Sequence, residues 1–253
     1  MKKFLLPLLI LTLGIAFLLG RFPETTRSER QQFQISAPTA SRAVAFGESG
    51  ELRHLPLPTK QDGALTVREM GGPVAERAEV NFTHDTDGSI ASFGSMTMPA
   101  PLTSVDGLQN LDNGLIHQLL IIPPDMNGDV GPNHYVQFVN SLIRVYDKTG
   151  QPMGPPFKIS SVFESLGTVC APRNDGVGLV QYDQLADRWL ITQTCTAFPP
   201  FRQMVAVSKT GDPLGGYYAY EFVMPNVRLN DFPKFGVWPD GYYMSTDEFL
   251  GSD

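Results

Sequence analysis

Eight short strand-like runs, separated by tight turns, dominate the second half of the chain. Each run has four to seven residues, is rich in β-branched or aromatic side chains, and is bounded by Gly, Pro, Asn or Asp, as β-strands are. From Pro123 onward, no window of eleven residues sustains the apolar period of a helix. The runs form four pairs: 134–140 with 142–146, 177–182 with 188–194, 204–208 with 217–223, and 235–238 with 242–245. The sequence therefore predicts an all-β fold built from antiparallel hairpins.

A short internal repeat suggests how these hairpins are arranged. Residues 148–154 (KTGQPMG) match residues 209–215 (KTGDPLG) at five of seven positions. We interpret each copy as a turn with Gly150 or Gly211 in a left-handed conformation, followed by a proline that starts an edge strand. Candidate inner strands begin near residues 135, 178 and 236. Because propeller blades are four-stranded sheets of about 40 to 50 residues, the pattern predicts antiparallel four-stranded blades, about two to three of them, in a partial β-propeller. Convergent turn chemistry is the alternative.

The N-terminal part of the chain predicts export. Lys2 and Lys3 precede an apolar run that ends at residue 20, which is the pattern of a signal peptide. The run is about 17 residues long, at the short end of what spans a bilayer, so an uncleaved N-terminal membrane anchor is the second interpretation and a buried core helix the third. Both leading interpretations place the rest of the protein outside the cytoplasm. We assign four regions: 1–20 as signal or anchor, 21–80 as a linker or disordered arm, 81–122 as an extended lead-in segment, and 123–253 as the partial propeller.

The net charge argues against a nucleic-acid partner, and the two cysteines predict a disulfide. The chain has 19 Lys and Arg against 26 Asp and Glu, a net charge of −7, so it lacks the basic excess that tracks nucleic-acid phosphates. Cys170 and Cys195 are the only cysteines, and they flank the predicted hairpin at 177–194. In an oxidising compartment this placement predicts a disulfide between them. Free buried thiols and a metal or redox role are the alternatives.

Three segments resemble a known family. Residues 123–136 (PPDMNGDVGPNHYV), 182–189 (YDQLADRW) and 232–243 (FPKFGVWPDGYY) resemble a largely uncharacterised family of secreted bacterial proteins that are expected to be β-propellers. The resemblance extends over residues 81–253, although family members carry Gly-Asp-Pro where this chain has DGVG at 175–178. It implies a propeller fold, an extracytoplasmic setting, and a chain that is the N-terminal fragment of a longer protein. It brings no reaction and no catalytic residues.

One candidate metal site precedes the first predicted strand. Asp125, Asn127 and Asp129 alternate along the segment DMNGDVG, which resembles the start of an EF-hand calcium loop. The glutamate that such a loop carries at its twelfth position is missing. Calcium, the one cofactor considered, and a plain Asx-rich turn therefore both remain open.

No catalytic residue is assigned. Asp183 and Asp187 flank a turn and either act as a glycosidase-type carboxylate pair or cap that turn. Four further acidic residues carry the same two interpretations: Asp231, Asp240, Asp247 and Glu248. His134 is interpreted as a structural residue at a strand start, because the chain has neither a Gly-x-Ser-x-Gly nor a His-Glu-x-x-His motif.

These observations favour an exported, non-catalytic β-propeller module for binding, adhesion or cell-surface architecture, with a glycan or another cell-surface molecule as partner. The aromatic clusters at 217–220 and 238–243 either pack between blades or stack on sugar rings. The alternative function is a secreted glycan-active hydrolase that uses carboxylates in the funnel of a complete propeller. A third, a membrane-tethered assembly factor, requires the N-terminal segment to remain uncleaved.

Overall fold

The computed structural model describes residues 41–59, 65–69, 100–196, 199–225 and 228–250. The predicted signal or anchor at 1–20 lies outside this part of the chain. The described part is mostly β, and its sheets are antiparallel except for one parallel pair, which confirms the all-β class. The described residues form neither a closed barrel nor a closed propeller.

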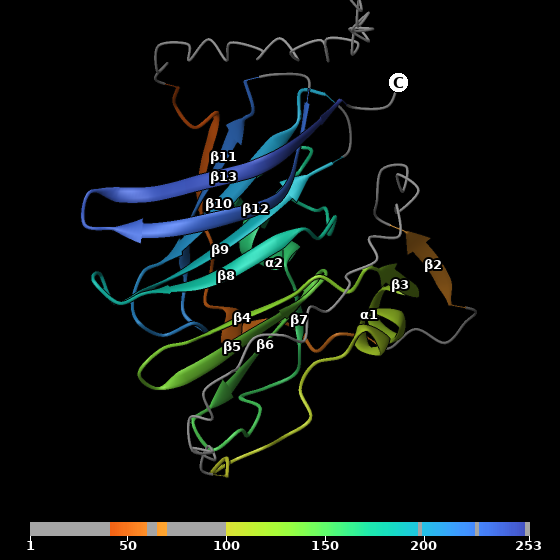
Figure 1. The fold of residues 1–253 in the computed structure, drawn as a ribbon, viewed down its shortest axis with the longest axis vertical. Coiled ribbons are helices and arrows are strands. Elements are labelled where there is room, and N and C mark those ends of the chain that lie inside the picture. Colours follow the sequence, from red (N-terminus) through yellow and green to blue (C-terminus); the bar gives the residue numbers. More distant parts are fainter. Residues whose placement is uncertain (1–40, 60–64, 70–99, 197–198, 226–227, 251–253) are drawn as a thin grey trace, which may run out of the picture. The chain divides into compact units, whose positions relative to one another are not determined.

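A four-stranded antiparallel sheet follows the chain order β4-β5-β6-β7 (Figure 1). Its strands are β4 (Met126–Val130), β5 (His134–Val139), β6 (Leu142–Asp147) and β7 (Phe157–Lys158). The predicted hairpin of β5 and β6 is confirmed. Its tight turn begins at Asn140, whose φ of 55° is left-handed, a conformation that asparagine tolerates better than most residues.

A five-stranded sheet has the order β1-β11-β10-β9-β8. Its strands are β8 (Gly178–Asp183), β9 (Arg188–Cys195), β10 (Arg202–Ser208), β11 (Tyr217–Val223) and β1 (Ala45–Glu48). The predicted hairpins β8–β9 and β10–β11 are confirmed. The short helical segments α2 (Ser160–Phe163), η1 (Leu52–His54) and η2 (Glu164–Leu166) lie outside the sheets.

Strand β1 corrects the prediction of a structureless arm at 21–80, because these four residues pair with β11 along the edge of the sheet. The four residues of β1, Ala-Phe-Gly-Glu, are too few and too weakly apolar to indicate a strand from the sequence. Gly47 itself is required by a close approach, since a Cβ there would lie 2.6 Å from the backbone oxygen of Ser165. The strand is therefore specified by tertiary contact.

The helix α1 (Asn110–His117) corrects the prediction of an extended segment at 81–122. Its eight residues include two Asn and one Gly, which are weak helix formers. Tertiary and capping bonds hold it: the Gln109 backbone N–H donates to Asp112 Oδ2 at 2.8 Å, and the Asn113 amide donates to the carbonyl of Val139 at 3.2 Å. The helix leads into β3 (Leu119–Ile122), which pairs in parallel with β2 (Thr66–Glu69).

The hairpin of β12 (Arg228–Trp238) and β13 (Gly241–Leu250) lies beside the five-stranded sheet at β8 (Figure 1). The paired runs predicted at 235–238 and 242–245 lie within these longer strands. In chain order, β4 is the first strand of the four-stranded sheet, β8 is the first of the strands β8–β11 in the five-stranded sheet, and β12 is the first strand of the hairpin. β4 lies beside β8, and β8 lies beside β12.

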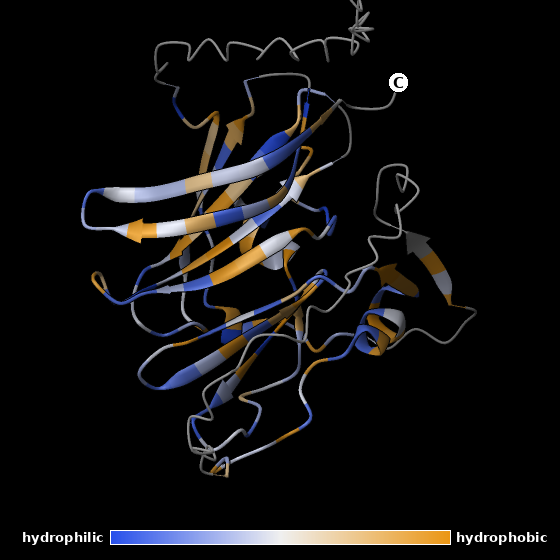
Figure 2. Ribbon diagram, viewed as in Figure 1, coloured by the Kyte–Doolittle hydropathy of each residue, from blue (hydrophilic) through white to orange (hydrophobic). Residues whose placement is uncertain are grey.

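The main core fills the space between the four-stranded and five-stranded sheets. Along the strands of both sheets, hydrophobic residues alternate with hydrophilic ones (Figure 2). Phe138, Phe163, Trp189 and Tyr217 are fully buried in it. A second cluster packs α1 onto the outer face of the four-stranded sheet. Truncation of one of the large core aromatics to alanine costs about 3–5 kcal/mol.

The two copies of the internal repeat use their first glycine differently. Gly150 has φ of 84°, which matches the predicted left-handed turn. Gly211 is not left-handed, so that part of the prediction is wrong. It is a close-approach glycine instead, because a Cβ there would lie 2.2 Å from Asp187 Oδ1.

Candidate ligand cavity

A cavity of about 300 Å³ lies where three sheets meet, and we call it the three-sheet cavity. Residues 123–127 before and at the start of β4, residues 177–179 at the start of β8, and residues 232–234 within β12 line it. Two of these segments belong to the motifs of the family resemblance, and the third overlaps the DGVG departure at residues 177 and 178. The volume is at the lower end of the range of about 300–1,000 Å³ for small-molecule sites.

Two bulky residues in the cavity wall have left-handed backbones. Val177 has φ of 48° and Phe232 has φ of 47°. Such conformations are outliers for β-branched or aromatic residues and cost about 1–3 kcal/mol each. β12 also changes register between Asp231 and Lys234, which marks an irregularity in the ladder beside the cavity. The wall is therefore held in a conformation that local sequence preference does not favour.

The cavity combines carboxyl, ammonium and aromatic groups. Burial raises the pKa of Asp125 above its ordinary value, the nearby Asp231 raises it further, and Lys234 opposes both effects. The Lys234 ammonium lies 3.3 Å from the centre of the Phe232 ring, a cation–π contact. Asp125 is therefore a carboxyl that holds its proton to a higher pH than a free aspartate.

Comparison of the chain with protein-family models, with curated proteins and with solved structures found no match in any of the three. Among the described residues, no helix has the length and apolar character needed to cross a membrane. Function is therefore inferred from the residues and their geometry.

The structure places the predicted calcium ligands on an edge between two sheets. Asn127 Oδ1 accepts the backbone N–H of Val180 at 2.6 Å, and Asp129 Oδ2 accepts that of Tyr182 at 2.7 Å. Asp129 Oδ1 accepts the N–H of Val130 at 2.7 Å, while Asp125 lines the three-sheet cavity. No group of three or more His, Cys, Asp or Glu within the described ranges is placed to hold a metal ion. Asn127 Oδ1 and Asp129 Oδ2 thus serve as acceptors for strand β8.

Asp183 and Asp187 are both engaged at the turn between β8 and β9. Asp183 accepts the backbone N–H groups of the turn and the hydroxyl of Tyr242 at 2.8 Å. Asp187 accepts the hydroxyl of Tyr182 at 2.6 Å, and this bond raises the pKa of Tyr182 to about 12. Burial and the bond to Asp183 likewise raise the pKa of Tyr242 to about 12. The carboxylates thus fix the turn and attach the β12–β13 hairpin to β8.

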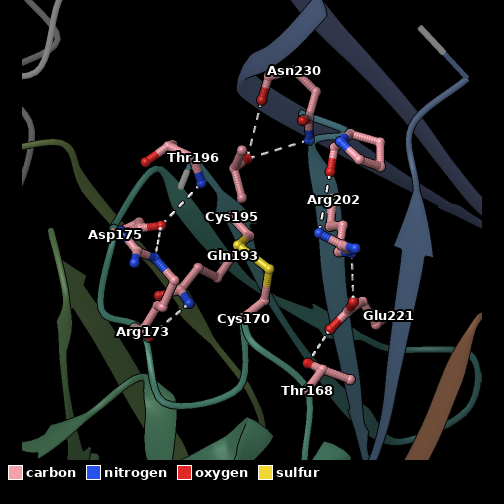
Figure 3. Close-up of a disulfide and its surroundings, with 12 residues drawn as sticks. Thr168, Cys170, Arg173, Asp175, Gln193, Cys195, Thr196, Arg202, Glu221 and Asn230 are labelled. Atoms are coloured by element: carbon pink, nitrogen blue, oxygen red, sulfur yellow. Dashed lines mark hydrogen bonds and ion pairs between the residues drawn. A yellow bond between two sulfur atoms is a disulfide. The ribbon is translucent and has the colours of Figure 1, made fainter. Parts of the chain in front are cut away.

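The Cys170–Cys195 disulfide is present and joins the end of β9 to the segment before β8 (Figure 3). Beside it, the Arg173 guanidinium donates two hydrogen bonds to Asp175, at 2.8 and 2.9 Å. Asp175 is buried and also accepts the backbone N–H of Thr196 at 2.9 Å. The disulfide and this ion pair therefore fix the segment that leads to Val177 in the cavity wall.

A second buried carboxylate lies on the other side of the disulfide (Figure 3). Glu221 is buried and lies 2.9 Å from Nε of Arg202, and it also accepts a bond from the Thr168 hydroxyl. Asn230 on β12 donates its amide to Gln203 at 2.8 Å, which connects the hairpin to β10. These contacts hold sheets and segments together.

Sequence reasoning missed the cavity residues Val177, Phe232 and Lys234. Phe232 and Lys234 lie in a motif segment and Val177 lies in the DGVG departure, which were the available signals. The predicted aromatic clusters divide between core and surface: Tyr217 is fully buried, whereas Tyr218, Trp238 and Tyr243 are exposed. His134 lies at the start of β5, opposite Asp147 in the ladder.

Proposed function

We propose that this chain is an exported, non-catalytic binding module in which three consecutive sheets are blades of a β-propeller. The observation that carries the proposal is the placement of β4, β8 and β12, which lie side by side and begin about 50 residues apart, close to one blade repeat. The sheet strands that follow β4 and β8 succeed one another in chain order, hairpin by hairpin, as in a blade. β1 is then an additional outer strand of the second blade.

The three-sheet cavity is the binding site in this proposal. Propeller blades surround a central channel, and the first strand of each blade borders it. Asp125 and Asn127 offer side-chain oxygens to a ligand with hydrogen-bond donors, and Phe232 offers an apolar face. The left-handed wall residues support a ligand role, because strained backbone concentrates at ligand clamps and active sites.

Two features support export. The N-terminal run behind Lys2 and Lys3 has signal-peptide composition. The Cys170–Cys195 disulfide persists only where thiols are oxidised, which in bacteria means outside the cytoplasm. A cleaved signal gives a secreted, periplasmic or surface protein, and an uncleaved one gives a membrane-anchored protein.

A secreted glycan hydrolase is the second candidate. The observation that favours it is Asp125, since a carboxyl with a raised pKa in a cavity beside another carboxyl is what a general acid of glycoside hydrolysis requires. Purified full chain incubated with soluble glucans, xylan and chitin oligosaccharides distinguishes the candidates. New reducing ends that disappear in Asp125→Asn support the hydrolase, and their absence supports the binding module.

Export is tested by fusing alkaline phosphatase, which is active only outside the cytoplasm, to the C-terminus of the full chain. We expect phosphatase activity in whole bacterial cells and loss of that activity when residues 4–20 are deleted. Activity in the membrane fraction identifies the uncleaved anchor, and activity in the soluble periplasmic fraction identifies a cleaved signal. An inactive full-chain fusion that is nevertheless produced would overturn the proposal.

A further inference from the structure

A second cavity, of about 360 Å³, lies on the outer face of the four-stranded sheet, away from the three-sheet cavity. We call it the tyrosine cavity. Tyr135 on β5 and Tyr146 on β6 form its base, and residues 103–107 pass beside them. The two tyrosines lie opposite each other in the β-ladder, so their rings share one face of the sheet.

The partly exposed ring of Tyr135 lies against the buried ring of Tyr146. Their centres are 5.8 Å apart and their planes are inclined by 30°. Tyr146 is buried and donates its hydroxyl to Gln137 Oε1 at 3.1 Å. Tyr135 is partly exposed, and no residue in the described part of the chain hydrogen-bonds its hydroxyl. Burial and the adjacent Tyr146 raise the pKa of Tyr135, so this hydroxyl remains a donor at neutral pH.

The segment at residues 103–108, which forms one side of the cavity, is held in place by the side chain of Gln137. The Gln137 side chain accepts the N–H of Leu108 at 2.6 Å and donates to its carbonyl at 3.1 Å, as a neighbouring strand would. Gly107 permits this approach, because a Cβ there would lie 2.4 Å from Gln137 Oε1. Gly150 approaches the same loop, since its Cβ would lie 2.9 Å from a methyl of Val105. The cavity is therefore largely preformed.

The polar groups at the rim of the tyrosine cavity include both donors and a carboxylate acceptor. Lys148 donates one bond to the carbonyl of Gly131 at 2.9 Å and retains two further N–H groups. Asp147 also lines the cavity, and its Oδ1 accepts bonds from Thr149 and Gln151 within the turn, while among the described residues its Oδ2 is left as an acceptor for a ligand hydroxyl. Tyr135 and Lys148 thus present donors beside an aromatic floor.

We propose that the tyrosine cavity binds one pyranose unit of a glycan. A pyranose ring has an apolar C–H face, which packs on an aromatic ring, and a rim of hydroxyl oxygens, which accept bonds from groups such as the Tyr135 hydroxyl and the Lys148 ammonium. An apolar ligand would leave these donors unsatisfied. The tyrosine cavity is separate from the three-sheet cavity, so a result at one cavity does not decide what the other binds.

The test is affinity electrophoresis of the full chain in native gels that contain barley β-glucan, xylan, galactomannan, dextran or glycol chitin. We expect at least one polysaccharide to retard the wild type. Tyr135→Ala removes the exposed ring and weakens that interaction about tenfold. Tyr135→Phe retains the ring and keeps most of the affinity. Gly107→Ala, whose methyl meets the Gln137 side chain that holds the loop, also weakens binding.

Tyr220→Ala is the matched control, because Tyr220 belongs to an aromatic surface on β11 rather than to the cavity. Circular dichroism and the melting temperature establish that each variant is folded. Retardation that is lost in Tyr135→Ala and retained in Tyr220→Ala supports the proposal. No retardation in any gel, equal retardation of Tyr135→Ala and the wild type, or loss confined to Tyr220→Ala would overturn it.

Discussion

Replacement of Asp129 by alanine tests how the first two sheets are joined. Asp129 Oδ2 accepts the backbone N–H of Tyr182 at 2.7 Å, on the edge of β8 that faces away from β9. Two positions earlier on β4, Asn127 makes the equivalent bond to Val180 at 2.6 Å. The two side chains therefore take the place of a paired strand along β8.

The expected cost follows from the charge of the acceptor. A hydrogen bond to a charged group contributes about 1.5–3 kcal/mol, and its removal leaves the partly buried N–H of Tyr182 without this acceptor. For about 2 kcal/mol, Asp129→Ala lowers the melting temperature by about 4–8 °C in a chain of this length. Asp129→Asn keeps an acceptor oxygen without its charge and loses less.

The assay is thermal unfolding of the full chain, with Asp247→Ala on the exposed face of β13 as control. Amide hydrogen exchange measured at Tyr182 reports the local effect, and we expect faster exchange in Asp129→Ala. The reasoning is refuted if Asp129→Ala and Asp247→Ala melt within about 1 °C of each other, since ordinary surface substitutions change stability by only about 0.5 kcal/mol.

Three further predictions follow from the cysteines, a close-approach glycine and the cavity aspartate. The cysteines of the disulfide are 25 residues apart, so its reduction lowers the free energy of unfolding by about 3 kcal/mol in the chain-entropy model. Urea unfolding with and without reductant measures this loss. Coincident unfolding curves would contradict the prediction. Gly211→Ala forces a methyl against the Asp187 carboxylate and costs about 1–3 kcal/mol, whereas Gly236→Ala, with open space around it, is the near-neutral control. The pKa of Asp125 is higher in the folded protein than in the unfolded chain, so the protein loses stability as the pH rises through the folded-state pKa and Asp125 ionises. Asp125→Asn removes this loss and therefore raises the melting temperature at pH 7. The difference disappears below the ordinary pKa of aspartate, where Asp125 is protonated in both states. An Asn variant no more stable than the wild type at pH 7 would count against this.

The hairpins were predictable because their signals are local. Alternating β-branched and aromatic residues between turn residues define β5 and β6, and the two strands pair as predicted. β1 and α1 were not predictable, because each is specified by distant partners. β1 needs the edge of β11, and α1 needs the carbonyl of Val139, neither of which leaves a pattern in the local sequence.

The candidate cavity was predictable only in part. The motif segments at 123–136 and 232–243 indicated regions of interest, and Asp125 was singled out among them. The left-handed conformations of Val177 and Phe232 were not predictable, since their side chains locally disfavour positive φ and only surrounding structure can impose it. The partnership of Asp125 with Asp231 also joins positions far apart in the chain.

The alternating oxygens of Asp125, Asn127 and Asp129 show why such a motif is ambiguous. A calcium loop needs oxygens that converge on one point, whereas a strand places every second side chain on one side and carries them along a line. β4 adopts the second geometry, and the N–H groups of β8 lie opposite that line. An edge strand must have its open N–H groups covered to avoid pairing with other chains, and two short polar side chains do so here. The same residue types can therefore bind a cation or accept hydrogen bonds from a strand edge, depending on what the fold places opposite them.

Because these oxygens bond to β8, added calcium or a chelator should leave the melting temperature of the wild type unchanged. A calcium-dependent rise in the melting temperature that Asp129→Asn abolishes would show that these oxygens can also converge on an ion.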